Sequence, residues 1–272
     1  MQTYFKTLKS LSLFLLITFF ATNIKAQEID LLLKGGHVID AKNKINGKMD
    51  VAIKDGKIFR VAADIPSSSA KKTVNVSGLY VTPGLIDIHG HVFHGTENNY
   101  LSNSLDALPP DGFTFRSGVT TVADAGGAGW KNIDLFRKNV VEHSKTRVLS
   151  FMNIVGGGMR GVDTYEQDEA DMDAKLTAAS AIKNKDIVIG IKLAHYIGHD
   201  WEPTDKAVEA GRIASIPVMV DFGKALPPLP LEDLLLKHLR PGDILTHAYR
   251  YDQEFDRNGK MLEHKQAIVD VK

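Results

Sequence analysis

The chain has 272 residues, of which 43% are hydrophobic and 24% are charged, a composition that can supply a full hydrophobic core. Its 33 basic and 33 acidic residues give a formal net charge of zero without a basic run, so no nucleic-acid partner is expected. The absence of cysteine excludes disulfides and thiolate chemistry, and any metal ion must be held by histidine, carboxylates or a modified lysine.

The first 26 residues have the pattern of a secretory signal peptide. Two lysines precede an apolar stretch over 11–21, which is short for a membrane span. Cleavage is expected after Ala26, with sites near Ala21 or Asn23 as alternatives. Such a leader predicts export, to a bacterial periplasm, and no stable membrane insertion of the mature protein. An uncleaved N-terminal anchor is the other interpretation.

Residues 27–78 are expected to form the N-terminal portion of a β-sandwich. Short apolar runs alternate there with tight turns. Asp55 and Gly56 lie between two such runs, at 49–53 and 58–62, a pattern typical of a β-hairpin.

From residue 79 onward, apolar runs alternate with segments of helical period. The expected strands cover 79–89, 119–124, 148–154, 187–192, 217–221 and 243–247, with a seventh at 267–271, and the expected helices cover 130–144, 170–184, 204–214 and 231–239. This alternation predicts a parallel α/β sheet with right-handed crossovers. Six or seven units favour a (β/α)8 barrel over 79–272, and an open doubly wound sheet is the alternative. Because a closed barrel needs eight strands, we expect a C-terminally truncated barrel.

The most informative stretch is Asp-Ile-His-Gly-His at 87–91, at the end of the first of these strands. Residues two apart in a strand point to the same side, so His89 and His91 present two imidazoles to one place. Neutral imidazole is a common ligand of zinc and similar ions. Two histidines do not complete a site, and a strand can carry such a pair by chance.

Further candidate ligands close later strands. Lys192, Asp221 and His247 stand at three strand ends, and in parallel α/β folds those ends form the active-site edge. A lysine at a strand end is commonly a surface residue. A desolvated lysine can instead lose its proton, and the neutral amine can react with carbon dioxide to give a carbamate, an anionic oxygen ligand.

Four stretches together resemble the amidohydrolase superfamily, and more narrowly its amidohydrolase/deacetylase metallohydrolases related to dihydroorotase. They are PGLIDIHGH at 83–91, SGVTTVADAG at 117–126, GIK at 190–192 and GDILTH at 242–247. The resemblance covers essentially all of the mature chain. It implies a TIM-type barrel paired with a β-sandwich that is built partly from the N-terminal segment.

The resemblance also implies a metal centre of one or two divalent ions, with zinc expected. His89 and His91 would bind one ion, a carboxylated Lys192 would bridge two, and His247 would bind the second. A metal-activated hydroxide would then hydrolyse an amide, cyclic amide or ester bond, such as that of an acyl or acetyl group.

The sequence departs from the family pattern in two places. Asp221 stands where the family usually has a histidine. It is either a metal ligand itself or a residue that contacts the ligands or the substrate without binding the metal. The family's acid–base aspartate follows the eighth strand, beyond Lys272, so no catalytic residue can be assigned. His195 and Tyr196 follow Lys192 closely and are candidate substrate-binding residues.

The sequence therefore predicts an exported, metal-dependent hydrolase of a small-molecule substrate, with oligomerisation left open. The alternative is a truncated, catalytically inactive remnant that at most binds metal.

Overall fold

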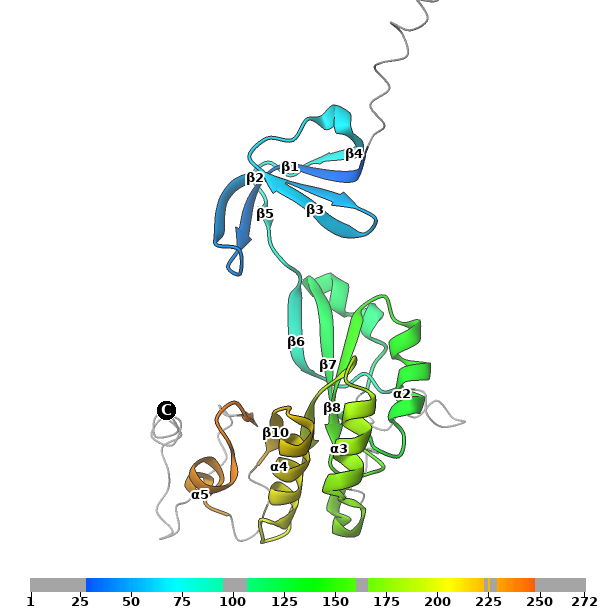
Figure 1. Ribbon diagram of the computed structural model, residues 1–272, viewed down its shortest axis with the longest axis vertical. Helices are drawn as coiled ribbons and strands as arrows, with labels where there is room; N and C mark the ends of the chain where they lie inside the picture. Colours follow the sequence, from blue (N-terminus) through cyan, green and yellow to red (C-terminus); the bar gives the residue numbers. More distant parts are fainter. Residues whose placement is uncertain (1–27, 95–106, 160–165, 223–224, 226–228, 248–272) are drawn as a thin grey trace, which may run out of the picture. The chain divides into compact units, whose positions relative to one another are not determined.

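The computed structural model describes residues 28–94, 107–159, 166–222, 225 and 229–247. The chain forms two compact units, Met1–Pro83 and Gly84–Lys272 (Figure 1). The predicted signal peptide and the predicted strand at 267–271 lie outside the described residues. In the described part of the chain, no helix combines the length and apolarity needed to cross a membrane.

The first unit is built on one five-stranded sheet, which confirms the predicted β-rich N-terminal portion. Its strands are β1 (Ile29–Asp40), β2 (Ile45–Lys54), β3 (Lys57–Ala62), β4 (Ala70–Asn75) and β5 (Tyr80–Val81), with a 3-10 turn η1 (Ser67–Ser69) before β4. The order is β3-β2-β1-β4, and β5 also pairs with β1. The pairs β1–β2 and β2–β3 are antiparallel, whereas β4 and β5 run parallel to β1.

The predicted hairpin joins β2 to β3. Asp55 and Gly56 both adopt left-handed backbone, with φ of 50° and 70°. This conformation gives the tight turn the twist that antiparallel strands require. The small core of the unit consists of Ile29, Leu32, Ala52, Ile65 and Ala70.

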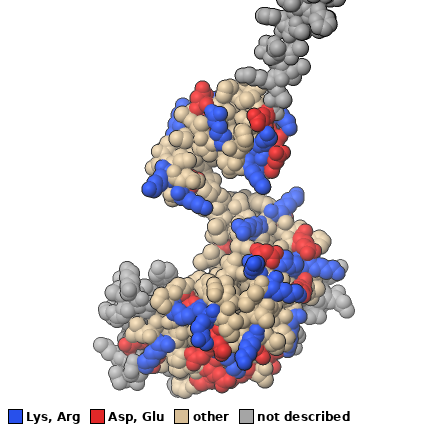
Figure 2. Space-filling model, in the orientation of Figure 1, with Lys and Arg blue, Asp and Glu red and all other residues tan. Residues whose placement is uncertain are grey.

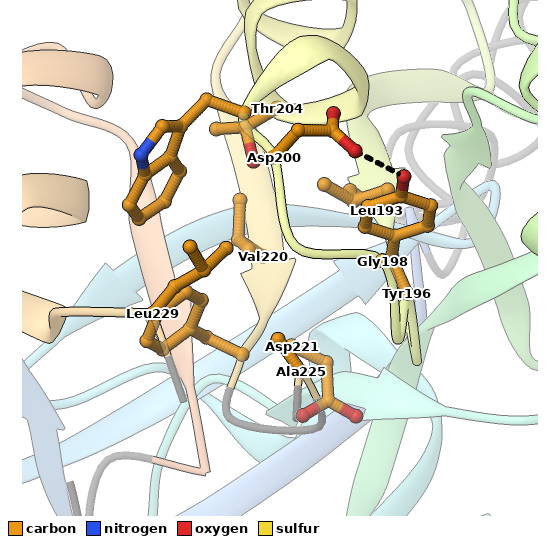
Figure 3. A pocket seen from close by; sticks show the side chains of 11 residues that line it. Leu193, Tyr196, Gly198, Asp200, Thr204, Val220, Asp221, Ala225 and Leu229 are labelled. Atoms are coloured by element: carbon orange, nitrogen blue, oxygen red, sulfur yellow. Dashed lines mark hydrogen bonds between the residues drawn. The ribbon is translucent and has the colours of Figure 1, made fainter. Parts of the chain in front are cut away.

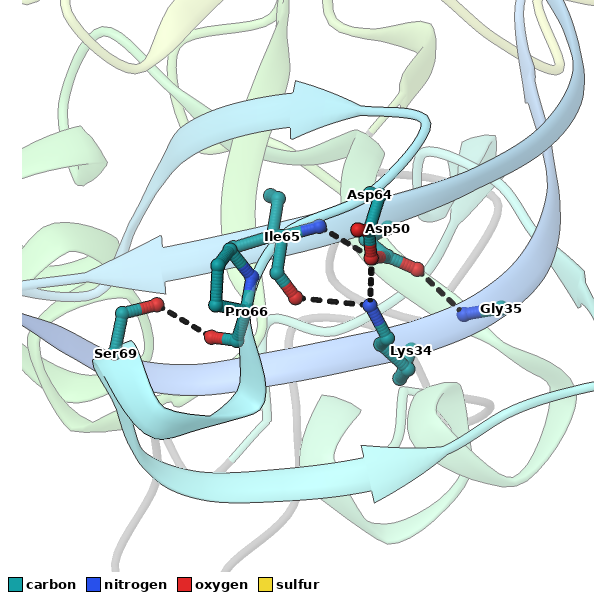
Figure 4. A network of polar contacts seen from close by, with 7 residues as sticks. All are labelled: Lys34, Gly35, Asp50, Asp64, Ile65, Pro66 and Ser69. Carbon is teal, nitrogen blue, oxygen red and sulfur yellow. Dashed lines mark hydrogen bonds and ion pairs between the residues drawn. The ribbon is translucent and has the colours of Figure 1, made fainter.

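A buried carboxylate, Asp50, ties β1 and β2 to the segment that follows β3 (Figure 4). One oxygen accepts hydrogen bonds from Lys34 Nζ and the backbone N–H of Ile65, both at 2.8 Å, and the other accepts from the N–H of Gly35 at 2.8 Å. Burial works to raise the pKa of Asp50, but these hydrogen bonds outweigh it and hold the pKa below its ordinary value. The network fixes β1 where its register shifts next to Gly35.

The second unit contains a curled sheet of six parallel strands, a half-barrel. These are β6 (Leu85–Gly90), β7 (Val119–Gly129), β8 (Arg147–Asn153), β9 (Val188–Leu193), β10 (Val218–Asp221) and β11 (Ile244–Thr246). Their spatial order follows the chain order from β6 to β11. A doubly wound sheet would reverse direction at a switch point, so the described strands fit the barrel prediction and not the open-sheet alternative.

Helices cover the outer face of this sheet (Figure 1). They are α2 (Ile133–Asn139), α3 (Ala174–Lys183), α4 (Glu202–Ala214) and α5 (Leu231–Asp233), which continues as a π-helical turn, η7 (Leu234–His238). Short 3-10 turns are η2 (Pro110–Gly112), η3 (Thr114–Ser117), η4 (Val141–His143) and η6 (Glu169–Asp171). Ile191, Leu193 and Val220 belong to the core between sheet and helices, whereas Ala125, Phe151 and Met219 form a separate cluster on the inner face.

Three predicted elements differ from the structure. The expected strand at 79–89 is divided between the two sheets as β5 and β6, because Pro83 has no N–H to donate to a ladder. The expected helix at 130–144 is the shorter α2 followed by η4. The expected helix at 170–184 begins only at Ala174, because the Asp173 carboxylate accepts hydrogen bonds from the backbone N–H groups of Lys175 and Leu176 and caps α3 there.

Charged side chains are mixed on the surface. On the face of the second unit shown in Figure 2, Lys and Arg lie among Asp and Glu. Arg137 of α2 pairs with Asp186, just beyond the end of α3, at 2.7 Å, and Lys183 of α3 pairs with Asp134 of α2 at 3.1 Å. Such exposed pairs contribute about 0–1 kcal/mol each, so they do not account for the fold.

Strand β6 forms one edge of the described sheet and presents apolar side chains to solvent. Leu85, Ile86 and Ile88 are 57%, 64% and 51% exposed. The buried strands β9 and β10 contrast with it, because almost all of their residues are covered.

Candidate metal centre

The carboxyl ends of four of the six strands bring the five predicted ligands to one edge of the sheet. His89 is near the end of β6 and His91 follows it, Lys192 is in β9, Asp221 ends β10, and His247 follows β11. Strand alternation places Lys192 on the inner face, because its neighbours Ile191 and Leu193 pack toward the helices.

Three imidazoles meet at this edge. The ring centroid of His89 lies 5.5 Å from that of His91 and 4.9 Å from that of His247. The Nδ1 atom of His89 is 2.7 Å from the hydroxyl oxygen of Thr246. Burial lowers the pKa of His89 to about 4, and the nearby charges of Lys192 and the other two histidines add to the effect. His89 is therefore neutral at neutral pH, the form that binds metals.

Lys192 is a buried amine. The residue is 1% exposed, and its Nζ has no hydrogen-bond partner among the described atoms. Burial lowers its pKa to about 8, although the negative charges of Asp221, Glu166 and Asp124 oppose the shift. Gly126 packs on its stem with φ of 98°, and a Cβ there would lie 2.7 Å from the lysine Cγ. An uncompensated buried amine is costly, so this position is suited to a chemically changed or ligated lysine.

Asp221 is paired with His195. The Oδ2 atom of Asp221 lies 3.1 Å from Nε2 of His195 and 3.7 Å from Nε2 of His247, while Oδ1 is buried without a partner among the described atoms. The other ring nitrogen of His195 is 2.7 Å from the carboxylate of Glu166. Hydrogen bonds to Asp221 and then Glu166 raise the pKa of His195 to about 9. Burial works to raise the pKa of Asp221, but the hydrogen bond from His195 and the charge of Lys192 hold it below its usual range.

The two predicted substrate-binding residues point to different places. His195 faces Asp221, whereas the Tyr196 hydroxyl donates toward Glu169 and toward Asp200 at 2.7 Å. Tyr196 lines a pocket between the ends of β9 and β10 and the start of α4, and Figure 3 shows its hydroxyl directed away from the Asp221 carboxylate. The substrate-binding role of both residues remains a prediction.

Asp124, which ends the predicted second strand, holds the backbone next to the candidate ligands. Strand β7 continues past it to Gly129, and the carboxylate is fully buried. It accepts hydrogen bonds from the backbone N–H groups of Val92 and Phe93, at 2.8 and 3.1 Å. Burial raises its pKa in spite of these bonds. The residue thus holds the segment that follows His91.

The donor set partly fits a divalent ion. Its nitrogen and oxygen atoms suit zinc, and Lys192 Nζ and Asp221 Oδ1 are buried polar atoms in need of a partner. In the described ranges, however, no group of three or more His, Asp or Glu side chains lies close enough together to hold a metal ion. The side chains pair off instead, as in His195 with Asp221.

Sequence reasoning missed two members of this cluster. Glu166 lies 29 residues before His195 in a segment without a regular pattern, so only the tertiary structure brings them together. Thr246 ends its strand and immediately precedes His247. This position beside a predicted ligand could have identified Thr246 as a residue that contacts the centre.

No family model matches the chain. Among curated proteins, it is 34% identical over 228 residues to a deacetylase of Enterococcus faecalis, covering 82% of this chain and 57% of that protein. A deacetylase of Brucella anthropi is 30% identical over 204 residues, covering 72% of this chain and 48% of that protein. The crystal structure of an adenine deaminase matches with a TM-score of 0.71 and 31% identity over 89% of this chain and 63% of that one.

The chain belongs to the amidohydrolase superfamily. This confirms the resemblance carried by the four sequence stretches. A dihydroorotase structure shares the fold, with a TM-score of 0.70 at 23% identity over 89% of this chain and 63% of that one. The chain spans about half the length of the curated relatives it matches, 48% and 57% for the two deacetylases.

Proposed function

We propose that this superfamily member is a metal-dependent hydrolase of amide, cyclic amide or ester bonds, such as those of N-acyl and acetyl groups. The observation that carries the proposal is a buried lysine amine without a partner among the described atoms, set beside histidines and carboxylates at the carboxyl edge of the sheet. The names of the relatives, deacetylase and dihydroorotase, support this bond class.

The proposed ligands are His89, His91, Lys192 and His247. Neutral imidazoles with carboxylate or carbamate oxygens favour zinc among the common divalent ions. Carboxylation of the Lys192 amine would turn an unsatisfied buried donor into an anion with two acceptor oxygens. The lowered pKa of Lys192, about 8, supports the neutral amine that this reaction needs.

The remaining residues would orient this centre. A bound divalent ion would supply Lewis acidity, which activates water and polarises a carbonyl group. The hydroxyl of Thr246, 2.7 Å from Nδ1 of His89, fixes the ring so that Nε2 is the nitrogen left for a ligand. Asp124 fixes the backbone beyond His91 through Val92 and Phe93.

Hydrolysis assays on three substrate classes test the proposal. The purified chain is loaded with zinc and given N-acetylated amino acids and a small acetyl ester, with release of acetate measured, and a six-membered cyclic amide, with ring opening measured. We expect hydrolysis of at least one class, lost on chelation and restored by zinc. The variant His89→Ala should lose this activity, whereas Asp134→Asn, in an exposed pair on α2, should retain it. Metal binding without hydrolysis of any class would contradict the catalytic proposal and favour a protein that only binds metal.

We also propose that the chain is exported, which rests on the signal-peptide pattern of residues 1–26. Fractionation of cells expressing the full sequence should place the protein outside the cytoplasm with a shortened N-terminus. A full-length N-terminus recovered from the cytoplasmic fraction would contradict this proposal.

A further inference from the structure

Asn153 lies beside Lys192 at the carboxyl edge of the sheet. The two residues are partners in the parallel ladder between β8 and β9. Their neighbours Met152 and Ile191 pack toward the helices, so strand alternation places both Asn153 and Lys192 on the inner face. Asn153 is 1% exposed, like the lysine. The amide and the amine are therefore buried polar groups on adjacent strands.

Two backbone groups fix the orientation of the Asn153 amide. Its Nδ2 donates to the carbonyl oxygen of Gly126 at 3.1 Å, and its Oδ1 accepts from the N–H of Val155 at 3.0 Å. A carbonyl can only accept and an N–H can only donate, so the nitrogen is the atom that faces Gly126. A primary amide carries two N–H groups, and among the described residues only the Gly126 carbonyl accepts from this nitrogen. One buried N–H of Asn153 is thus left for another acceptor.

The stem of Lys192 lies next to this amide nitrogen. A Cβ added to Gly126 would lie 2.7 Å from Cγ of Lys192 and 3.3 Å from Nδ2 of Asn153, so both atoms adjoin the same side of Gly126. The Nζ atom of Lys192 is buried and has no hydrogen-bond partner among the described atoms. An ammonium group and an amide N–H are both donors, so neither can satisfy the other. A carboxylate formed on Nζ supplies the acceptor oxygens that this place lacks.

We infer that Asn153 is a positioning residue for a carboxylated Lys192, and that its second amide N–H donates to the carbamate. This inference rests on the proposed function, which includes the carbamate. In the reaction the neutral amine attacks the carbon of carbon dioxide. A nitrogen–carbon bond forms as one carbon–oxygen π bond breaks, and the nitrogen loses one proton to solvent. The negative charge is shared by two oxygens, and a hydrogen bond to such a charged group is stronger than one to a neutral group, so Asn153 favours the carbamate over the free amine.

The test follows the carbamate resonance that ¹³C-labelled carbon dioxide gives in the zinc-loaded full chain, and measures the bicarbonate concentration that produces half of the maximal signal. The variant Asn153→Leu removes the amide without adding a charge. The variant Asn153→Asp keeps an acceptor for the N–H of Val155 but, when ionised, has no N–H to donate. We expect both variants to need roughly 10–100-fold more bicarbonate than the wild type, the factor that a hydrogen bond to a charged group contributes.

The matched control is Asn132→Asp. Asn132 precedes α2 and makes the same pair of bonds to backbone groups, since its Nδ2 donates to the carbonyl of Gly157 at 2.8 Å and its Oδ1 accepts from the N–H of Gly129 at 2.9 Å. It is not a partner of Lys192 in the ladder. This variant should keep the bicarbonate requirement of the wild type.

The outcomes separate this inference from the proposed function. A folded Asn153→Leu chain with the wild-type bicarbonate requirement would overturn the inference and leave the carbamate standing. A rise in Asn153→Asp alone would assign the effect to charge repulsion, and an equal rise in Asn132→Asp would assign it to a general loosening of the edge, so either would also overturn it. A wild type without a carbamate resonance would overturn the proposed modification of Lys192 itself. If circular dichroism shows that Asn153→Leu is unfolded, Asn153→Ala takes its place as the uncharged variant.

Discussion

Replacing Gly126 by alanine tests whether the Lys192 side chain is packed as the structure describes. At φ of 98° any side chain is strained, and the added Cβ would lie 2.7 Å from the Cγ of Lys192. Gly242 provides a matched control, because it has the same φ of 98° but nothing within 4 Å of an added Cβ. The comparison therefore separates backbone strain from the contact with Lys192.

Both variants carry a strain of about 1–3 kcal/mol. Overpacking at Gly126 adds about 1–3 kcal/mol, which for a domain of this size lowers the midpoint of thermal unfolding by a further ~2–12 °C. Thermal unfolding followed by circular dichroism measures this difference, and zinc content is measured on the same samples. We expect Gly126→Ala to lose zinc and Gly242→Ala to keep it. Equal losses of stability in the two variants would refute the described packing of Lys192.

Three other predictions concern single side chains. Lys192→Ala should lose bound zinc together with the carbamate resonance that ¹³C-labelled carbon dioxide gives in the wild type, and unchanged zinc content would contradict the carbamate. Because the pKa of Asp50 is lowered in the folded state, its contribution to stability is present above its unfolded pKa of about 3.9 and is lost as the pH falls through the folded value. Urea unfolding between roughly pH 5 and pH 2 should therefore show a weaker pH dependence for Asp50→Asn than for the wild type, and parallel curves would refute this. Asp173→Ala removes the cap of α3 and should cost about 1 kcal/mol in urea unfolding without changing zinc content, and a loss of zinc would contradict a purely local role.

The sequence was sufficient for the fold because its patterns are local. Apolar runs that alternate with helical segments indicate the parallel sheet of the second unit. The Asp55–Gly56 turn marks the β2–β3 hairpin of the N-terminal sheet without tertiary information. The placement of His89, His91, Lys192, Asp221 and His247 at one edge follows from the same rule, since parallel strands end together.

Other features depend on contacts that no local pattern records. Glu166 reaches His195 across 29 residues, and Asp221 pairs with His195, which lies 26 positions earlier and has left-handed backbone. Two errors were avoidable. Pro83 interrupts the strand expected at 79–89 because it lacks an N–H, and Asp173 stands before the apolar period of α3 as an N-cap residue commonly does.

The apolar edge at β6 has a consequence for how the molecule behaves in concentrated solution. Among the described residues β6 pairs only with β7, so its other edge and the exposed Leu85, Ile86 and Ile88 offer backbone groups and an apolar surface to another strand of suitable length. Association through this edge would depend on one strand of the scaffold, while the proposed metal centre lies at the strand's far end, where His89 begins the cluster. Solubility and reactivity are therefore separable properties, and charged substitutions on the outer part of β6 can adjust the first without touching the second.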